Sequence, residues 1–233
     1  MKLKSFGCSF IFGNELADDG HNGSYVVASQ LTWPAHLAQH INHSYSCYAR
    51  PGAGNLQIAE QVLNQIGTSQ ADDVFVIGWT WVDRFDYYSV NPTDLSCSQW
   101  TTLMPADQTT LAKTYYKELH SEYRDKLTTL INIKLVIDSL RQKQITFLMT
   151  YMDCLIFDRR WNTSAAVSDL QNFVEPYMTQ FEGMSFLEWS KKNKYPISTV
   201  WHPLDEAHRA AGDYMIKIFD TQKNKPLHLK ETQ

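Results

Sequence analysis

Residues 74–78, the run Val-Phe-Val-Ile-Gly, constrain the fold more than any other stretch because they contain no polar side chain. Asp72 and Asp73 stand directly before the run and mark where it begins. A continuous apolar run of this length is typical of a strand buried on both faces, as in the middle of a parallel sheet. Parallel strands are joined through crossovers, usually helices, so the rest of the chain has to supply helices for both faces of the sheet.

The other segments alternate between strand and helix patterns, as such a sheet requires. Thr32 and Pro34 mark one helix start, because threonine caps a first turn and proline fits inside it. Further strands are expected at 2–7, 45–49 and 145–151, and helices at 32–41, 56–66, 111–142 (one helix or two), 168–181 and 205–218, with a weak strand or loop at 184–189. Residues 79–110 lack periodicity and are expected to form an excursion over the active-site edge of the sheet.

This alternation predicts an α/β fold, a three-layer α/β/α sandwich with a mainly parallel central sheet of the flavodoxin-like type. One domain is expected to span 1–221, followed by a polar tail at 222–233. A chain of 233 residues, 43% hydrophobic and 20% charged, is ordinary for one folded domain of this kind.

Charge and cysteine usage exclude several function classes. The formal net charge of -4 offers no overall positive field, so neither nucleic acid nor an anionic membrane is expected as a partner. The four cysteines (8, 47, 97 and 154) are widely spaced without a Cys-x-x-Cys pair, which favours free thiols in a reducing compartment over disulfides or a zinc site. The N-terminus lacks the apolar core of a signal peptide, and no run is long enough to span a bilayer, so a cytoplasmic location is expected. The oligomeric state stays open.

Ser9 follows the first expected strand and precedes a turn-rich loop at 10–30. A serine at a strand tip exposes its hydroxyl beside the backbone N–H groups of Ser9 and Phe10, an arrangement that favours a nucleophile with donors for an oxyanion. In parallel sheets ligands bind at the carboxyl ends of the strands, where the glycines at 52 and 54 and residues 78–80 are also expected. The alternative is that Ser9 only caps a turn.

Short blocks along the chain resemble those of the SGNH (GDSL-type) hydrolase superfamily. Gly7-Cys8-Ser9-Phe10 resembles the first block, in which the serine is the nucleophile. Pro51-Gly52-Ala53-Gly54 resembles the second, in which a glycine N–H serves the oxyanion; Gly52 is the preferred alignment and Gly54 the second choice. Trp201-His202-Pro203 resembles the last block, which makes His202 the base. The resemblance runs from Ser9 to about residue 218, and it implies the SGNH-type fold and a hydrolase without cofactor or metal.

Two departures from the family pattern affect the expected site. The third block is normally Gly-x-Asn-Asp, whereas this chain has Gly78-Trp79-Thr80-Trp81, so Thr80 takes the place of an oxyanion-binding amide. Loss of one such donor costs about 10²–10³ in rate. The family acid lies three residues before the histidine, where this chain has Thr199. His202 would then be oriented by Thr199 or a backbone carbonyl as a Ser-His dyad, or by Asp153 or Asp158 from the end of the fourth strand.

Asp205-x-x-His208 matches the family's Asp-x-x-His literally and is the rival assignment of acid and base. His202 is preferred, because family members often carry a second histidine six residues after the catalytic one, inside the final helix. Asp205 then occupies the expected N-cap of that helix.

The resemblance implies a serine esterase that hydrolyses small acyl esters, such as O-acetyl groups of a carbohydrate, through a Ser9 acyl-enzyme. Trp79, Trp81 and Arg84 are candidate substrate-binding residues, the arginine for a carboxylate or sugar acid; core packing and an internal ion pair are the alternatives. A catalytically weak glycan- or protein-binding module is the alternative function, and an acyltransferase lies between the two. The first and third blocks are also similar to a branch of the superfamily found in bacteriophage genomes.

Overall fold

A computed structural model describes residues 1–18, 27–91, 93, 99–160 and 162–223. Its central sheet has the order β2-β1-β3-β6, and every pairing is parallel. The strands are β1 (Lys2–Phe6), β2 (Ser44–Cys47), β3 (Val74–Trp79) and β6 (Thr146–Tyr151). Every residue of β3 is buried between two neighbours, which confirms the interpretation of the apolar run.

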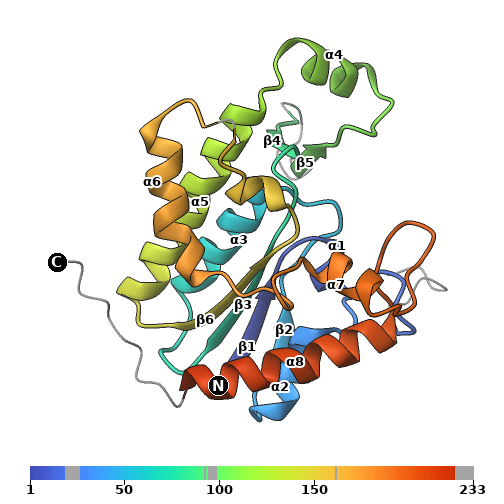
Figure 1. Ribbon diagram of the computed structural model, residues 1–233, viewed down its shortest axis with the longest axis vertical. Helices are drawn as coiled ribbons and strands as arrows, with labels where there is room; N and C mark the ends of the chain where they lie inside the picture. Colours follow the sequence, from blue (N-terminus) through green and yellow to red (C-terminus); the bar gives the residue numbers. More distant parts are fainter. Residues whose placement is uncertain (19–26, 92, 94–98, 161, 224–233) are drawn as a thin grey trace.

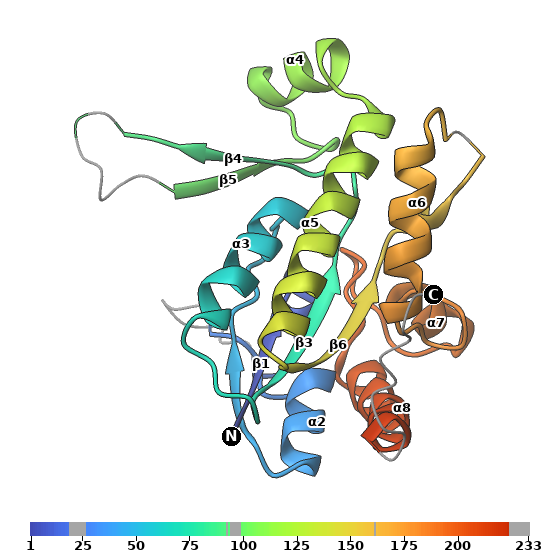
Figure 2. The same cartoon turned by 90° about the vertical axis from the view of Figure 1, so that its left-hand side faces the viewer.

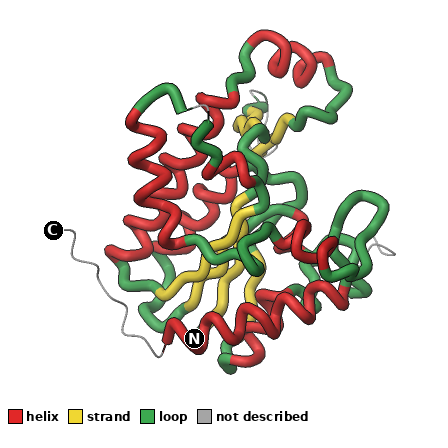
Figure 3. Tube along the Cα trace, viewed as in Figure 1, coloured by secondary structure: helices red, strands yellow, loops and turns green. Residues whose placement is uncertain are grey.

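Helices cover both faces of this sheet, as Figures 1 and 3 show. One face packs against α3 (Asn55–Ile66), α5 (Glu122–Gln142) and α6 (Ala165–Val174), the other against α2 (Trp33–His40), α7 (Phe186–Lys192) and α8 (Asp205–Lys223). Alternate residues of β3 serve the two sides: Phe75 and Ile77 belong to the first core, and Val74 and Val76 to the second. The expected three-layer α/β/α sandwich is confirmed.

The excursion after β3 contains a hairpin that the sequence did not reveal. Strands β4 (Phe85–Ser89) and β5 (Gln99–Leu103) pair antiparallel in a two-stranded sheet of their own, which projects from the body in Figure 2. The following helix α4 (Thr110–Glu118) packs against its base through Leu103, Ala112 and Tyr115. The long helical pattern is therefore two helices, α4 and α5, each capped by a side chain, from Thr109 and Ser121.

Three further segments differ from expectation. The loop after β1 begins with a short helix, α1 (Ser9–Phe12). The segment expected as weak strand or loop is largely helix α7, which a capping box between Ser185 and Glu188 starts. The region after β6 holds two 3₁₀ turns, η2 (Cys154–Phe157) and η3 (Glu175–Tyr177), on either side of α6. Helix α8 continues to Lys223, and the rest of the expected tail lies outside the described residues. Within the described chain, the helices are too short or too polar to cross a bilayer.

Candidate active site

Ser9 is the first residue of α1, directly beyond the end of β1. Gly7 makes this turn with a φ of 156°, and a Cβ at that position would lie 2.9 Å from the carbonyl oxygen of Gly78. Only glycine fits such a close approach between the ends of two strands. Because Ser9 occupies the first helical position, its N–H has no acceptor within the helix and is free to face a ligand.

His202 lies next to Ser9 although 193 residues separate them: the Ser9 Oγ and His202 Nε2 are 2.9 Å apart. The histidine ends a tight loop in which the Ser198 N–H donates to the His202 carbonyl oxygen at 2.9 Å. Trp201 takes a positive φ of 71° in this loop. Pro203 pairs with Ile197 in an isolated antiparallel bridge, so the loop closes just before α8 begins at Asp205.

The second ring nitrogen of His202 contacts a residue that sequence reasoning missed. The Nδ1 atom lies 2.5 Å from Oε2 of Glu15, in the loop that follows α1. A carboxylate only accepts hydrogen bonds, so Nδ1 carries the proton and Nε2 accepts from the Ser9 hydroxyl. Ser9, His202 and Glu15 are therefore joined in one hydrogen-bonded chain, in the order that a Ser-His-acid triad has. Glu15 stands only six residues after the serine, on the nucleophile's own loop.

Tertiary contacts hold Glu15 in place. Its backbone has a positive φ of 67°, which is uncommon for a residue with a side chain. Two residues later, the Ala17 N–H donates to Oδ1 of Asp205 at the start of α8. The Ser198 hydroxyl donates to Glu15 Oε2 at 2.6 Å and accepts from the His202 N–H at 3.2 Å. One hydroxyl thus joins the acid to the backbone of the base.

The acids and the threonine proposed from the sequence do not orient His202. Thr199 is exposed, and its neighbour Ser198 makes the contacts expected of it. Asp153 accepts hydrogen bonds from the N–H groups of Val82 and Leu155, at 2.9 Å each. Asp158 pairs with Arg160 beside it. These assignments are wrong, because Asp153 joins the loop after β3 to the turn after β6 and Asp158 is paired with Arg160.

The two glycines of the second block differ in what their N–H groups can do. Arg50 donates from its N–H to the carbonyl oxygen of Gly7 at 2.9 Å, which holds the turn beside the end of β1. The Gly54 N–H donates to Oδ1 of Asp86 at 3.0 Å and is occupied. Among the described residues, none accepts from the Gly52 N–H, whose φ of 79° requires glycine. Of the two candidates, Gly52 is the one that can still donate to an oxyanion.

Thr80 does not fit the oxyanion role expected for it. The residue is fully buried, and its enclosed hydroxyl has no hydrogen-bond partner in the described chain. Asn55 fixes its backbone, accepting from the Thr80 N–H at 2.8 Å and donating to its carbonyl oxygen at 3.1 Å. A bound substrate cannot reach this hydroxyl without a rearrangement.

Asp205 and His208, the rival pair, each bind a different partner. His208 is 1% exposed, packs against Phe186, and accepts at Nδ1 from the Trp33 N–H at 3.2 Å. Burial lowers the pKa of His208 to about 3, so the ring is neutral. Asp205 accepts from Ala17 instead of facing this histidine. The structure pairs Ser9 with His202.

Comparisons with known proteins connect this geometry to a fold. No protein-family model matches the sequence, and no curated protein matches it. Among solved structures, TesA matches with a TM-score of 0.53 at 11% identity, covering 96% of this chain and 99% of its own. The chain has the SGNH hydrolase fold. The esterase EstA of Pseudoalteromonas sp. matches at 0.51 and 7% identity, over 97% of this chain and 100% of its own. The acetyl xylan esterase Est2A of Butyrivibrio proteoclasticus matches at 0.52 and 11% identity, and this chain spans 64% of its length.

The SGNH fold expected from the short blocks is thus confirmed at the level of structure. The bacteriophage branch and the cytoplasmic location stay predictions.

An aromatic ring packs against His202, but not all the rings expected at the site lie there. The ring of Phe10 lies 5.3 Å from His202 and 5.8 Å from Trp81, between centroids. Trp81 is partly exposed and carries the guanidinium of Arg84 over its face at 4.7 Å. Trp79 is fully buried in the core, so its expected substrate contact is wrong: its side chain fills the space between sheet and helices.

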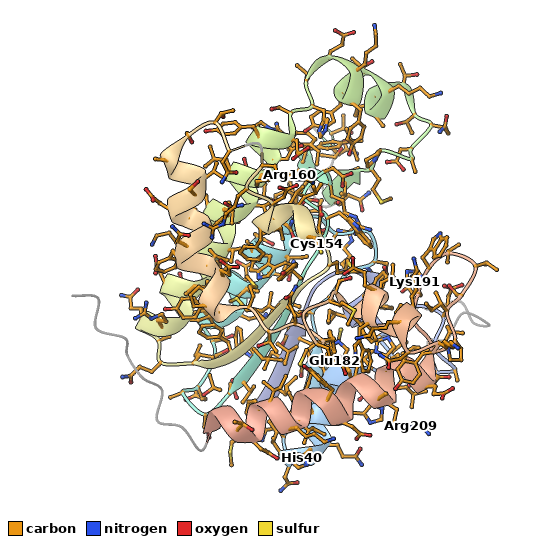
Figure 4. All side chains as sticks on the ribbon, viewed as in Figure 1. His40, Cys154, Arg160, Glu182, Lys191 and Arg209 are labelled. Atoms are coloured by element: carbon orange, nitrogen blue, oxygen red, sulfur yellow. The ribbon has the colours of Figure 1, made fainter. Side chains whose placement is uncertain are left out.

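Trp201, the residue before His202, is an exposed aromatic residue that the sequence analysis did not single out. Its side chain is 59% exposed, which is unusual for a ring of this size. The ammonium of Lys191, from the end of α7, lies 4.1 Å from the ring centroid. Figure 4 labels Lys191 beside the loop that carries His202. This cation–π contact holds the exposed indole ring at the surface.

Proposed function

We propose that this protein is a serine ester hydrolase in which Ser9, His202 and Glu15 form the catalytic triad. The observation that carries this proposal is the chain of two hydrogen bonds, 2.9 Å from Ser9 to His202 and 2.5 Å from His202 to Glu15. Both nitrogens of the imidazole are engaged in the order that general-base catalysis needs.

The proposed reaction begins when the Ser9 oxygen attacks the ester carbonyl carbon while its proton moves to Nε2 of His202. Glu15 accepts the Nδ1–H and stabilises the imidazolium that forms. The N–H groups of Ser9 and Gly52 hold the oxyanion. The imidazolium then protonates the leaving alcohol oxygen as the C–O bond breaks, which leaves an acyl group on Ser9. A water molecule, deprotonated by His202, releases the acid and restores the serine.

Two backbone donors serve the oxyanion in this arrangement, because the Thr80 hydroxyl is enclosed. A hydrolase with one donor fewer is expected to be slower by about 10²–10³. This feature favours the second candidate function, a catalytically weak module that binds a glycan or protein at the same edge. An intact triad argues for turnover, because a binding module has no need of it.

The proposed substrates are small acyl esters, in particular O-acetyl groups on a carbohydrate. Two observations support a carbohydrate: the exposed Trp201 ring beside His202, and the acetyl xylan esterase among the proteins that share the fold. An acyltransferase would use the same acyl-enzyme with an alcohol in place of water.

Labelling with a fluorophosphonate probe, measured as intact mass, tests the proposal. We expect one adduct on the wild type and none on Ser9→Ala or His202→Ala. An adduct that persists in Ser9→Ala would overturn the assignment of the nucleophile. No adduct on the folded wild type, together with saturable glycan binding, would establish the binding module instead.

A further inference from the structure

Arg84 lies between the two segments that carry the nucleophile and the oxyanion donor. Its Nη1 donates to the carbonyl oxygen of Ala53 at 2.9 Å, and Ala53 directly follows Gly52. Its guanidinium stacks over the ring of Trp81, which packs against Phe10, the neighbour of Ser9. Two independent contacts therefore fix a positive charge at the rim of the site.

The guanidinium has hydrogen-bonding capacity to spare. Arginine has five N–H donors in a planar fork. Among the described residues, the Ala53 carbonyl oxygen is the one acceptor that the Arg84 guanidinium donates to. The side chain is partly exposed, so the remaining donors can reach a ligand. A stacked arginine with a free edge matches a carboxylate in a bidentate manner.

The nearest carboxylates do not neutralise this charge by direct contact. Asp86 uses both oxygens elsewhere: Oδ1 accepts from Gly54 and Thr102, and Oδ2 accepts from the Gln57 N–H at 2.9 Å. Asp83 forms no hydrogen bond or salt bridge with Arg84 and interacts with it only at longer range. Burial raises the pKa of Asp83. No described carboxylate forms a salt bridge with Arg84.

We propose that Arg84 binds an anionic group of the substrate, so that the preferred ester carries a carboxylate. This inference rests on the proposed hydrolase function and adds the substrate class. Trp81 holds the guanidinium in one plane, and Ala53 holds it at a fixed position beside the oxyanion turn. The carboxylate belongs either to the acyl group, as in the half-ester of a dicarboxylic acid, or to the alcohol, as in an acetylated sugar acid.

Two pairs of esters distinguish these sources. p-Nitrophenyl hemiglutarate against p-nitrophenyl valerate places the charge in the acyl group. 4-Acetoxybenzoate against 4-methylphenyl acetate places it in the alcohol. For each pair the measured quantity is kcat/KM for the anionic ester divided by kcat/KM for the neutral ester. This ratio is expected to be larger for one pair, and that pair identifies the part of the substrate that carries the carboxylate.

The variants are Arg84→Met and Arg84→Lys, with Arg209→Met as the matched control. Arg209 is an exposed arginine on α8, labelled in Figure 4. Its replacement changes the net charge equally. In Arg84→Met the ratio for the preferred pair should fall about tenfold or more, through a higher KM for the anionic ester, because the charge-assisted hydrogen bonds of the guanidinium are lost. In Arg84→Lys the ratio should lie between those of Arg84→Met and the wild type. In Arg209→Met it should equal that of the wild type.

The inference fails if the ratio is unchanged in Arg84→Met, or if Arg209→Met lowers it as much. A fall in activity that is equal for both members of each pair would assign Arg84 a structural role on the turn and would also overturn the inference. These outcomes differ from failure of the hydrolase proposal, in which the wild type cleaves neither pair and takes no fluorophosphonate.

Discussion

His202 and His208 lie six residues apart, yet they belong to opposite environments. His202 stands on a loop, partly exposed, with Ser9 on one ring nitrogen and Glu15 on the other. His208 lies inside α8, fully enclosed, and uses its Nδ1 to accept the N–H at the start of α2. The first ring has a hydrogen-bonding partner on each nitrogen, whereas burial lowers the pKa of the second ring and keeps it neutral.

The difference shows that a histidine's function follows from its partners rather than from its motif. Asp205-x-x-His208 fits a family pattern in letters, but the spacing falls on a helix that turns the ring into the core. The residue that accepts from Nδ1 of His202 comes from a loop 187 residues away in the sequence. Four experiments sharpen this comparison.

The largest difference in activity is expected between variants of the two histidines. We expect His202→Ala to lower kcat/KM for p-nitrophenyl acetate by about 10⁴ or more, because the serine loses its base. His208→Gln should keep most of the activity, since a glutamine oxygen can still accept from the Trp33 N–H. An equal loss in both folded variants would contradict the comparison.

Glu15→Gln tests the partner that makes His202 different. The amide keeps the shape but cannot stabilise the imidazolium, so kcat/KM should fall by about 10²–10⁴. Glu206→Gln removes the same charge from an exposed position on α8 and serves as the control. A kcat/KM within about threefold of wild type in Glu15→Gln would mean that His202 works as a dyad with Ser9, because loss of a hydrogen bond to a charged group should cost about tenfold or more.

Ser198→Ala probes the hydroxyl that joins acid and base. We expect kcat to fall about tenfold with little change in KM, because a charge-assisted hydrogen bond that orients the pair is lost. Ser198→Thr keeps a hydroxyl and should recover most of the rate. Thr199→Ala alters the exposed neighbour and should leave kcat unchanged. No recovery in the threonine variant would indicate loss of loop packing instead of loss of orientation.

The elements that sequence analysis located share strong local signals. The central strand was evident from its uninterrupted apolar run, and α2 from the Thr32 cap, whose side chain accepts from the Ala35 N–H. The hairpin of β4 and β5 was missed because its strands mix aromatic and polar residues without alternation. Its pairing is defined by cross-strand contacts such as Tyr88 on Trp100, which no local pattern predicts.

The site was predictable where it lies at strand ends and unpredictable where loops meet. Ser9 follows from its place at the end of a strand, and Gly52 and His202 follow from the resemblance of their blocks to the SGNH pattern. Glu15 does not, because its position depends on a positive φ and on the contact of its loop with Asp205. Thr80 follows a strand as expected, but Asn55 holds its backbone and the core encloses its hydroxyl. Burial of this kind is a tertiary property.

The smallest effect on activity, and the clearest on stability, should come from His208 at acidic pH. Its pKa is about 3 in the folded protein and 6.5 when exposed, so between these values only the unfolded chain binds the proton. The free energy of unfolding should therefore be unaffected by this group above pH 6.5. It should fall towards pH 3, by at most about 1.4 kcal/mol per pH unit. His208→Gln lacks this loss, so its urea unfolding free energies should decline less steeply than those of the wild type between pH 6.5 and 4. If the unfolding free energies of the wild type and His208→Gln changed in parallel with pH, His208 would bind its proton in the folded protein as well. Burial would then not keep this ring neutral, and the two histidines would differ only in where they lie.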